Sequence, residues 1–73
     1  MSRDQVTDIV MSALEVEGRD PGLRIADDLG ISSVALLFGA IKIEKATGVR
    51  FNGAHFNDFT TPDDMIDFVC ERM

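Results

Sequence analysis

Apolar residues recur at helical spacing in three parts of the chain, and stretches without this period separate them. The first part follows Ser2, and Gln5 stands three residues further on, which is the spacing of a capping box. The apolar positions after it follow the i, i+3, i+4, i+7 rule of a helix with one buried face: Val6, Ile9, Val10, Ala13 and Leu14. This pattern predicts a first helix over about residues 3–16.

The second apolar segment is richer than a surface helix requires, because Lys42 is the only charged residue between Val34 and Ile43. The pattern predicts a helix over residues 33–47 that ends at Gly48. Two apolar lines run along this helix: Leu36, Ala40 and Ile43 form one, and Val34, Leu37, Phe38 and Ile41 form the other. One line is expected to face the core. The other line is either buried as well or exposed to solvent or to a partner.

A third helix is predicted to begin after Thr61. Pro62 takes the first helical position, where its missing N–H costs nothing, and two aspartates follow in the first turn. The residues expected on its inner face are Met65, Ile66, Val69 and Met73.

The segments between these helices carry turn-forming residues. Glycine, proline and paired aspartates indicate irregular structure over residues 18–30, with Leu23, Ile25 and Leu29 anchoring it to the core. Residues 49–51 read as an extended link and residues 52–56 as a single helical turn. The predicted fold is therefore all-α, with three main helices and one short helix. Its expected core contains Val6, Ile9, Val10, Leu14, Leu29, Leu36, Ile43, Phe51, Phe59, Ile66 and Val69.

Composition narrows the possible functions. A chain of 73 residues is expected to form a single domain, 1–73, whose core is too small to wall off a deep active site. A net charge of −6 disfavours nucleic acid as a partner. The lone cysteine, Cys70, is compatible with a cytoplasmic location and excludes an internal disulfide. No membrane span or signal segment is expected, and His55 has no second ligand in sequence for a metal site.

Residues 28–34 read D-L-G-I-S-S-V and resemble the D-L-G-x-D-S-L motif of the acyl and peptidyl carrier protein family. Two further segments match that family in register. Residues 43–51 are similar to its L-E-x-x-F-x-x-x-I helix ending, and residues 59–69 to its I-T-T…I-D-Y-I close. The resemblance implies a four-helix acyl-carrier-like bundle and a 4'-phosphopantetheine group, taken from coenzyme A and attached covalently to Ser33.

The sequence departs from the family pattern in three ways. Ser32 replaces the usual aspartate beside the modified serine, and Val34 replaces leucine. Lys42 and Lys45 lie on a helix that is acidic in fatty-acid carriers, so the usual acid-to-base docking is expected to be weaker here. The apolar line of Val34, Leu37, Phe38 and Ile41 is then expected to provide more of the partner contact.

The resemblance thus implies a stand-alone carrier that is no enzyme itself and holds acyl groups as thioesters. It points to polyketide, fatty-acid or nonribosomal-peptide biosynthesis. The expected partners are a phosphopantetheinyl transferase and the enzymes that load and process the acyl group, with the carrier itself a monomer. An alternative stays open at this point: a helical interaction module that keeps the carrier fold and lacks the arm. A third class, a small enzyme, is disfavoured because no nucleophile–base pair or phosphate-binding glycine loop is visible.

Overall fold

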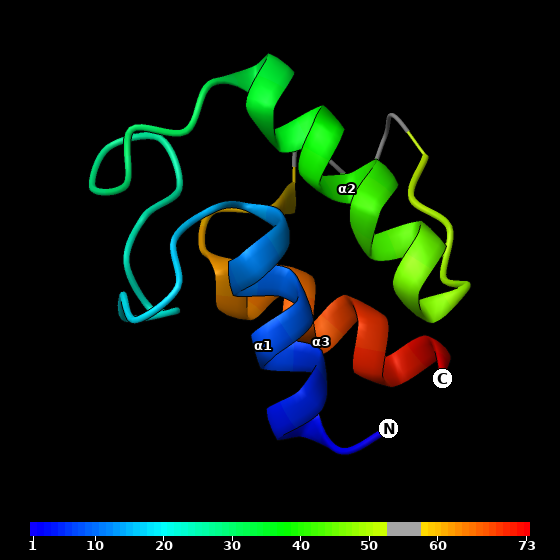
Figure 1. Ribbon diagram of the computed structural model, residues 1–73. Helices are drawn as coiled ribbons and strands as arrows, with labels where there is room; N and C mark the ends of the chain where they lie inside the picture. Colours follow the sequence, from blue (N-terminus) through cyan, green and yellow to red (C-terminus); the bar gives the residue numbers. More distant parts are fainter. Residues whose placement is uncertain (53–57) are drawn as a thin grey trace.

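The computed structural model describes residues 1–52 and 58–73, and these ranges contain three helices and no strand. The helices are α1 (Arg3–Ala13), α2 (Ser33–Thr47) and α3 (Pro62–Arg72). Helix α1 packs against both α2 and α3, and the long segment between α1 and α2 forms one side of the molecule (Figure 1). The predicted all-α class is confirmed. Of the short helix expected over 52–56, Asn52 is not helical and the other positions lie outside the described residues.

The helix starts follow the predicted caps. The Ser2 hydroxyl accepts from the Gln5 backbone N–H at 3.2 Å, while the Ser2 N–H donates to the Gln5 side chain at 2.8 Å. At α3 the same reciprocal pair forms between Thr61 and Asp64, with distances of 3.0 and 3.3 Å. Helix α2 ends as expected at Gly48, whose positive φ of 77° a residue with a side chain rarely adopts.

Helix α1 ends earlier than the pattern predicted. It stops at Ala13, and Glu15 takes a left-handed conformation with φ of 60°, although neither glycine nor proline occurs before Gly18. The Val16 N–H instead donates to the Met11 carbonyl at 2.9 Å, which closes the helix end. The early stop turns the chain so that Leu14 stays buried beside Gly39 of α2.

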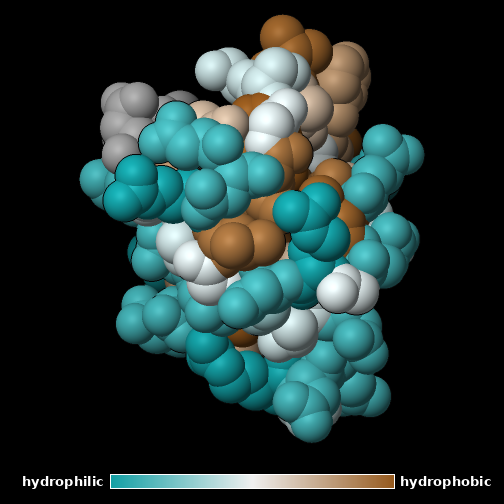
Figure 2. Space-filling view, turned by 90° about the vertical axis from the view of Figure 1, so that its left-hand side faces the viewer, coloured by the Kyte–Doolittle hydropathy of each residue, from teal (hydrophilic) through white to brown (hydrophobic). Residues whose placement is uncertain are grey.

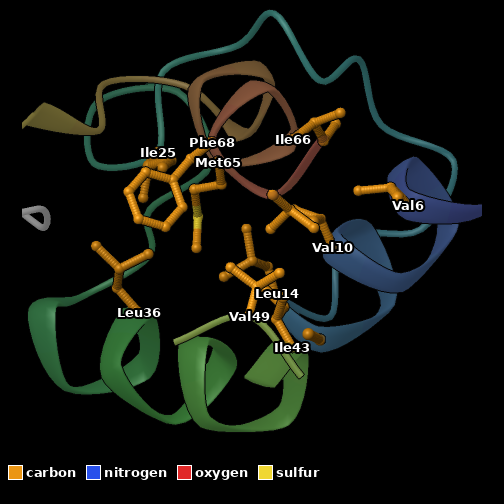
Figure 3. Packing of buried hydrophobic residues seen from close by; sticks show 12 residues of the cluster. Val6, Val10, Leu14, Ile25, Leu36, Ile43, Val49, Met65, Ile66 and Phe68 are labelled. Atoms are coloured by element: carbon orange, nitrogen blue, oxygen red, sulfur yellow. The ribbon is translucent and has the colours of Figure 1, made fainter. Parts of the chain in front are cut away.

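The core lies where the inner faces of the three helices meet. Figure 3 shows Val6 and Val10 of α1 near Ile66 of α3, and Leu14, which directly follows α1, near Ile43 of α2. Three members of the expected core, Ile9, Phe51 and Phe59, are only partly buried against the cluster. Leu29 is half-buried outside the cluster. The prediction for Met73 is wrong, because this residue follows the end of α3 and is exposed.

An aromatic group closes one end of the core. The rings of Phe51 and Phe68 stack with centroids 5.0 Å apart, and Phe59 meets both rings edge-on at 5.7 and 5.5 Å. Such pairs contribute beyond the area they bury. Phe68 is buried, and the Arg72 guanidinium lies over its ring at 3.5 Å from the centroid. This group connects the segment after α2 with α3.

The start of α1 is joined to α3 by an ion pair. The Arg3 guanidinium lies 2.7 Å from the Asp67 carboxylate, and this hydrogen bond raises the pKa of Arg3. Both side chains are more than half exposed, so solvent screening keeps the contribution to stability small. Stability therefore rests mainly on the buried apolar cluster.

Two adjacent leucines of α2 test whether stability depends on the buried face of this helix. Leu36 is 9% exposed and Leu37 is 48% exposed. We expect Leu36→Ala to lower the free energy of unfolding by about 2–5 kcal/mol, because it leaves a cavity in the core. Leu37→Ala is the matched control, with an expected loss below about 1 kcal/mol. Urea unfolding measures both. Equal losses would show that the buried face of α2 is misassigned.

Candidate functional site

The segment before α2 is a folded loop whose turns are fixed by the D-L-G-I-S-S-V residues. The Asp28 carboxylate accepts from the Arg24 N–H at 2.9 Å, and the Arg24 carbonyl accepts from Asp28 and Leu29 at 3.0 and 2.9 Å. Gly30 then has φ of +67°, which lets the chain reverse toward the helix. The Ile31 N–H donates to the Ile25 carbonyl at 2.9 Å. Asp28 and Gly30 thus shape the entry to α2.

This loop is tied to the segment before α3. The Ile25 N–H donates to the Thr60 carbonyl at 2.8 Å, and the Asp63 N–H donates to the Pro21 carbonyl at 3.0 Å. Ile25 itself is buried in the core, beside Met65 and Phe68 in Figure 3. As a result the loop delivers the start of α2 to a fixed place at one end of the molecule, at the top of Figure 1.

The two serines at this end have different structural roles. Ser32 is the N-cap of α2, and its hydroxyl accepts from the Ala35 N–H at 3.2 Å. Ser33 is the first residue of the helix, and its side chain is exposed. Within the part of the chain that the structure describes, the Ser33 hydroxyl makes no hydrogen bond. Ser33 therefore offers a free hydroxyl on a rigid support, beside the unpaired amides of a helix start.

A shallow hollow of about 240 Å³ lies beside Ser33. Its wall has an apolar part, which includes Ile25, Ile31 and Leu36, and a charged part formed by Arg24 and Asp27. The Arg24 guanidinium and the Asp27 carboxylate are 3.5 Å apart, and both are largely exposed. The hollow is open to solvent, so an extended group attached at Ser33 has room to lie along the surface or to leave it.

The second apolar line of α2, formed by Val34, Leu37, Phe38 and Ile41, is exposed and not buried in the core. Exposed fractions are 62% for Val34, 48% for Leu37, 60% for Phe38 and 43% for Ile41. Figure 2 shows apolar atoms at the top of the molecule, over the start of α2, above a mostly hydrophilic surface. The predicted site residues therefore form a continuous strip that begins next to Ser33. Large apolar side chains grouped on a surface in this way are typical of an interaction site.

A family model described as the phosphopantetheine attachment site matches residues 4–69. The chain belongs to the phosphopantetheine attachment site family. It is thus a carrier that holds acyl groups on covalently attached 4'-phosphopantetheine. Membership also implies enzymes that modify the carrier and act on its acyl groups. Searches among curated proteins and among solved structures gave no match. None of the helices in the described ranges is long and apolar enough to cross a membrane.

The residues at the start of α2 fit this group. The phosphodiester of the arm is an anion, and the free N–H groups and dipole of a helix start stabilise an anion. The Ser33 hydroxyl is accessible, and the hollow beside it leaves room for the arm. When bound, the arm supplies the terminal thiol that carries acyl groups as thioesters. The chain's own part would be to supply the exposed serine hydroxyl and the helix start that bears the phosphodiester.

Some parts of the site were not predicted from the sequence. The cap formed by the Asp28 carboxylate on the Arg24 N–H was missed, because Asp27 and Asp28 were interpreted only as loop charges. An aspartate in a glycine-containing loop often accepts a hydrogen bond from a nearby backbone N–H and so closes a turn. The loop's bond to Thr60 joins residues 35 positions apart and has no local sequence signal.

Because Ser32 caps the helix and Ser33 does not, their alanine variants are predicted to differ in stability. Ser32→Ala removes the N-cap, and we expect a loss of about 0.5–2 kcal/mol in the free energy of unfolding. Ser32→Asp keeps a side-chain acceptor at the cap and adds favourable charge, so it should be at least as stable as the parent. Ser33→Ala should change stability by less than about 0.5 kcal/mol. Urea unfolding of the three variants checks this, and a large loss for Ser33→Ala would contradict the assignment.

Proposed function

We propose that Ser33 is the residue to which the phosphopantetheine arm is attached. The observation that carries this proposal is the exposed hydroxyl at the first position of α2, which makes no hydrogen bond in the described part of the chain. The neighbouring Ser32 hydroxyl is engaged at the cap, so it is the poorer acceptor. The family match and the D-L-G-I-S-S-V sequence support the same residue.

The carrier's role in this proposal is presentation and not catalysis. In the transfer, which the transferase performs, the Ser33 oxygen bonds to the phosphorus that carries the pantetheine of coenzyme A. The pyrophosphate P–O bond breaks, adenosine 3',5'-bisphosphate leaves with the bridging oxygen, and the hydroxyl proton passes to a base of the transferase. The chain then provides each partner with a tethered substrate at high effective concentration. Acyl-loading and acyl-processing enzymes are the proposed partners, in polyketide, fatty-acid or nonribosomal-peptide biosynthesis. That the carrier works as a separate monomer, over a single domain 1–73, and in the cytoplasm stays a prediction.

The proposed contact surface for these partners is the exposed line of Val34, Leu37, Phe38 and Ile41. It begins one residue from Ser33 and continues along α2, so an enzyme that covers it also has its active site near the arm. Large apolar side chains at the centre of an interface account for most of its binding energy. Their exposure in the free chain therefore supports a docking role.

Intact-protein mass spectrometry tests the attachment site. The chain is incubated with coenzyme A, magnesium and a broad-specificity phosphopantetheinyl transferase. We expect the parent to gain the mass of one phosphopantetheine and Ser33→Ala to gain none. Ser32→Ala is the matched control, because it removes the adjacent hydroxyl and should still gain the full mass, although more slowly if the cap helps to hold the site.

Loading of Ser33→Ala would show that another hydroxyl accepts the arm. If no transferase loads the parent, the chain would instead be an interaction module that keeps the fold and lacks the arm. Circular dichroism of each variant, recorded beforehand, separates loss of the acceptor from loss of the fold.

A further inference from the structure

Two lysines extend the exposed face of α2. Phe38, Ile41, Lys42 and Lys45 follow the i, i+3, i+4, i+7 spacing, so they lie on one side of the helix. A groove of about 440 Å³ runs between this side of α2 and the end of α1. Its walls include all four of these residues, together with Ala13, Leu14, Glu15 and Ala35. The groove is thus apolar at its centre and carries two cationic groups along one edge.

These lysines are exceptional in a chain with a net charge of −6. Four of the five arginines are engaged with carboxylates: Arg3, Arg24, Arg50 and Arg72. Lys42 and Lys45 are exposed, and among the described residues no carboxylate lies within ion-pair distance of either one. Their charges are therefore available to a partner, and they lie beside the apolar side chains that a partner would cover.

The acidic groups near the groove restrict how a partner can lie. Glu15 lines the opposite wall, and Asp8 lines a second hollow that Lys42 also borders. Glu44, on the same helix, is paired with Arg50 at 3.6 Å. Carboxylates of a partner are attracted by the α2 edge and repelled by the α1 edge. Only one orientation across the groove therefore matches the charges.

We propose that this groove is the docking site for a partner enzyme whose surface has an apolar projection flanked by carboxylates. The projection fits against Phe38 and Ile41, and the carboxylates face Lys42 and Lys45. The inference rests on the proposed function, because it concerns the enzymes that a carrier serves. An acidic helix at this position would select a basic partner. The two lysines of this chain select an acidic one.

Two synthetic amphipathic helical peptides serve as probes. Both have the same leucine-rich face, and the flanking positions are glutamate in one and lysine in the other. Each is titrated at low salt into the isotope-labelled, unmodified chain, and the backbone amide shifts are followed by NMR. We expect the glutamate peptide to bind about two- to thirtyfold more tightly, since two exposed ion pairs together contribute about 0.4–2 kcal/mol. The shifts should centre on residues 35–45, and molar salt should reduce the difference.

Charge variants sharpen the test. The double variant Lys42→Glu/Lys45→Glu should reverse the peptide preference. Arg19→Glu is the matched control, because Arg19 is exposed outside the groove, and it should leave the preference unchanged. Equal binding of the two peptides, shifts centred elsewhere, or no binding would overturn the proposal. So would concentration-dependent shifts without peptide, which would place a second copy in the groove, or binding to anionic lipid vesicles over these same residues.

The experiment is independent of the arm. It uses the unmodified chain, so a failure to load Ser33 leaves its outcome standing. Conversely, normal loading of Ser33 with equal peptide binding would retain the carrier function and reject only the acidic partner.

Discussion

The burial of Ile25 determines where the start of α2 lies. Eighteen residues without a helix, from 14 to 31, precede the Ser32 cap, and a segment of this length is free to take many paths unless it is anchored. The Ile25 side chain enters the core, while its N–H bonds to Thr60 and its carbonyl to Ile31. One residue thereby joins the loop to both α3 and the start of α2. The position of Ser33 follows from this anchor, with no help from Ser33 itself.

One side of α2 is buried and the other is exposed, and this difference follows from the close contact of α2 with the end of α1. A Cβ atom at Gly39 would approach Leu14 Cδ2 to 2.7 Å and the Ala13 carbonyl oxygen to 3.4 Å. Glycine at this position allows the end of α1 to pack directly against the helix backbone. The inner face is thus completed by Leu36, Ala40 and Ile43, and the outer apolar side chains have no place in the core. Their exposure is a consequence of close packing on the other side.

The helix starts and most of the core could be predicted from the sequence, because local signals determine them. Ser2, Ser32 and Thr61 supply capping oxygens, and the i, i+3, i+4 spacing identifies buried positions such as Val10 and Ile66. The early end of α1 had no sequence signal, since Glu15 adopts a positive φ where neither glycine nor asparagine stands. Val49 is buried outside any helical pattern, and Phe68 packs against Phe51 and Phe59, which are distant or separate from its helix in sequence.

The candidate site was predicted less completely than the fold. Ser33 was located by motif, and the exposed strip by an excess of apolar residues on one helix. The loop that positions Ser33 depends on a carboxylate-to-backbone bond at Asp28 and on a distant carbonyl at Thr60. Neither bond follows from hydrophobic pattern, because both arise from the three-dimensional path of the loop.

Ser32 caps the helix and Ser33 is the proposed acceptor of the arm, and this separation has a consequence for how the protein matures. In small zinc proteins folding waits for the cofactor, because the metal holds the structure together. Here the Ser32 hydroxyl caps the helix, and the Ser33 side chain takes no part in that cap. The unmodified chain is therefore expected to reach its native state before the transferase acts on it.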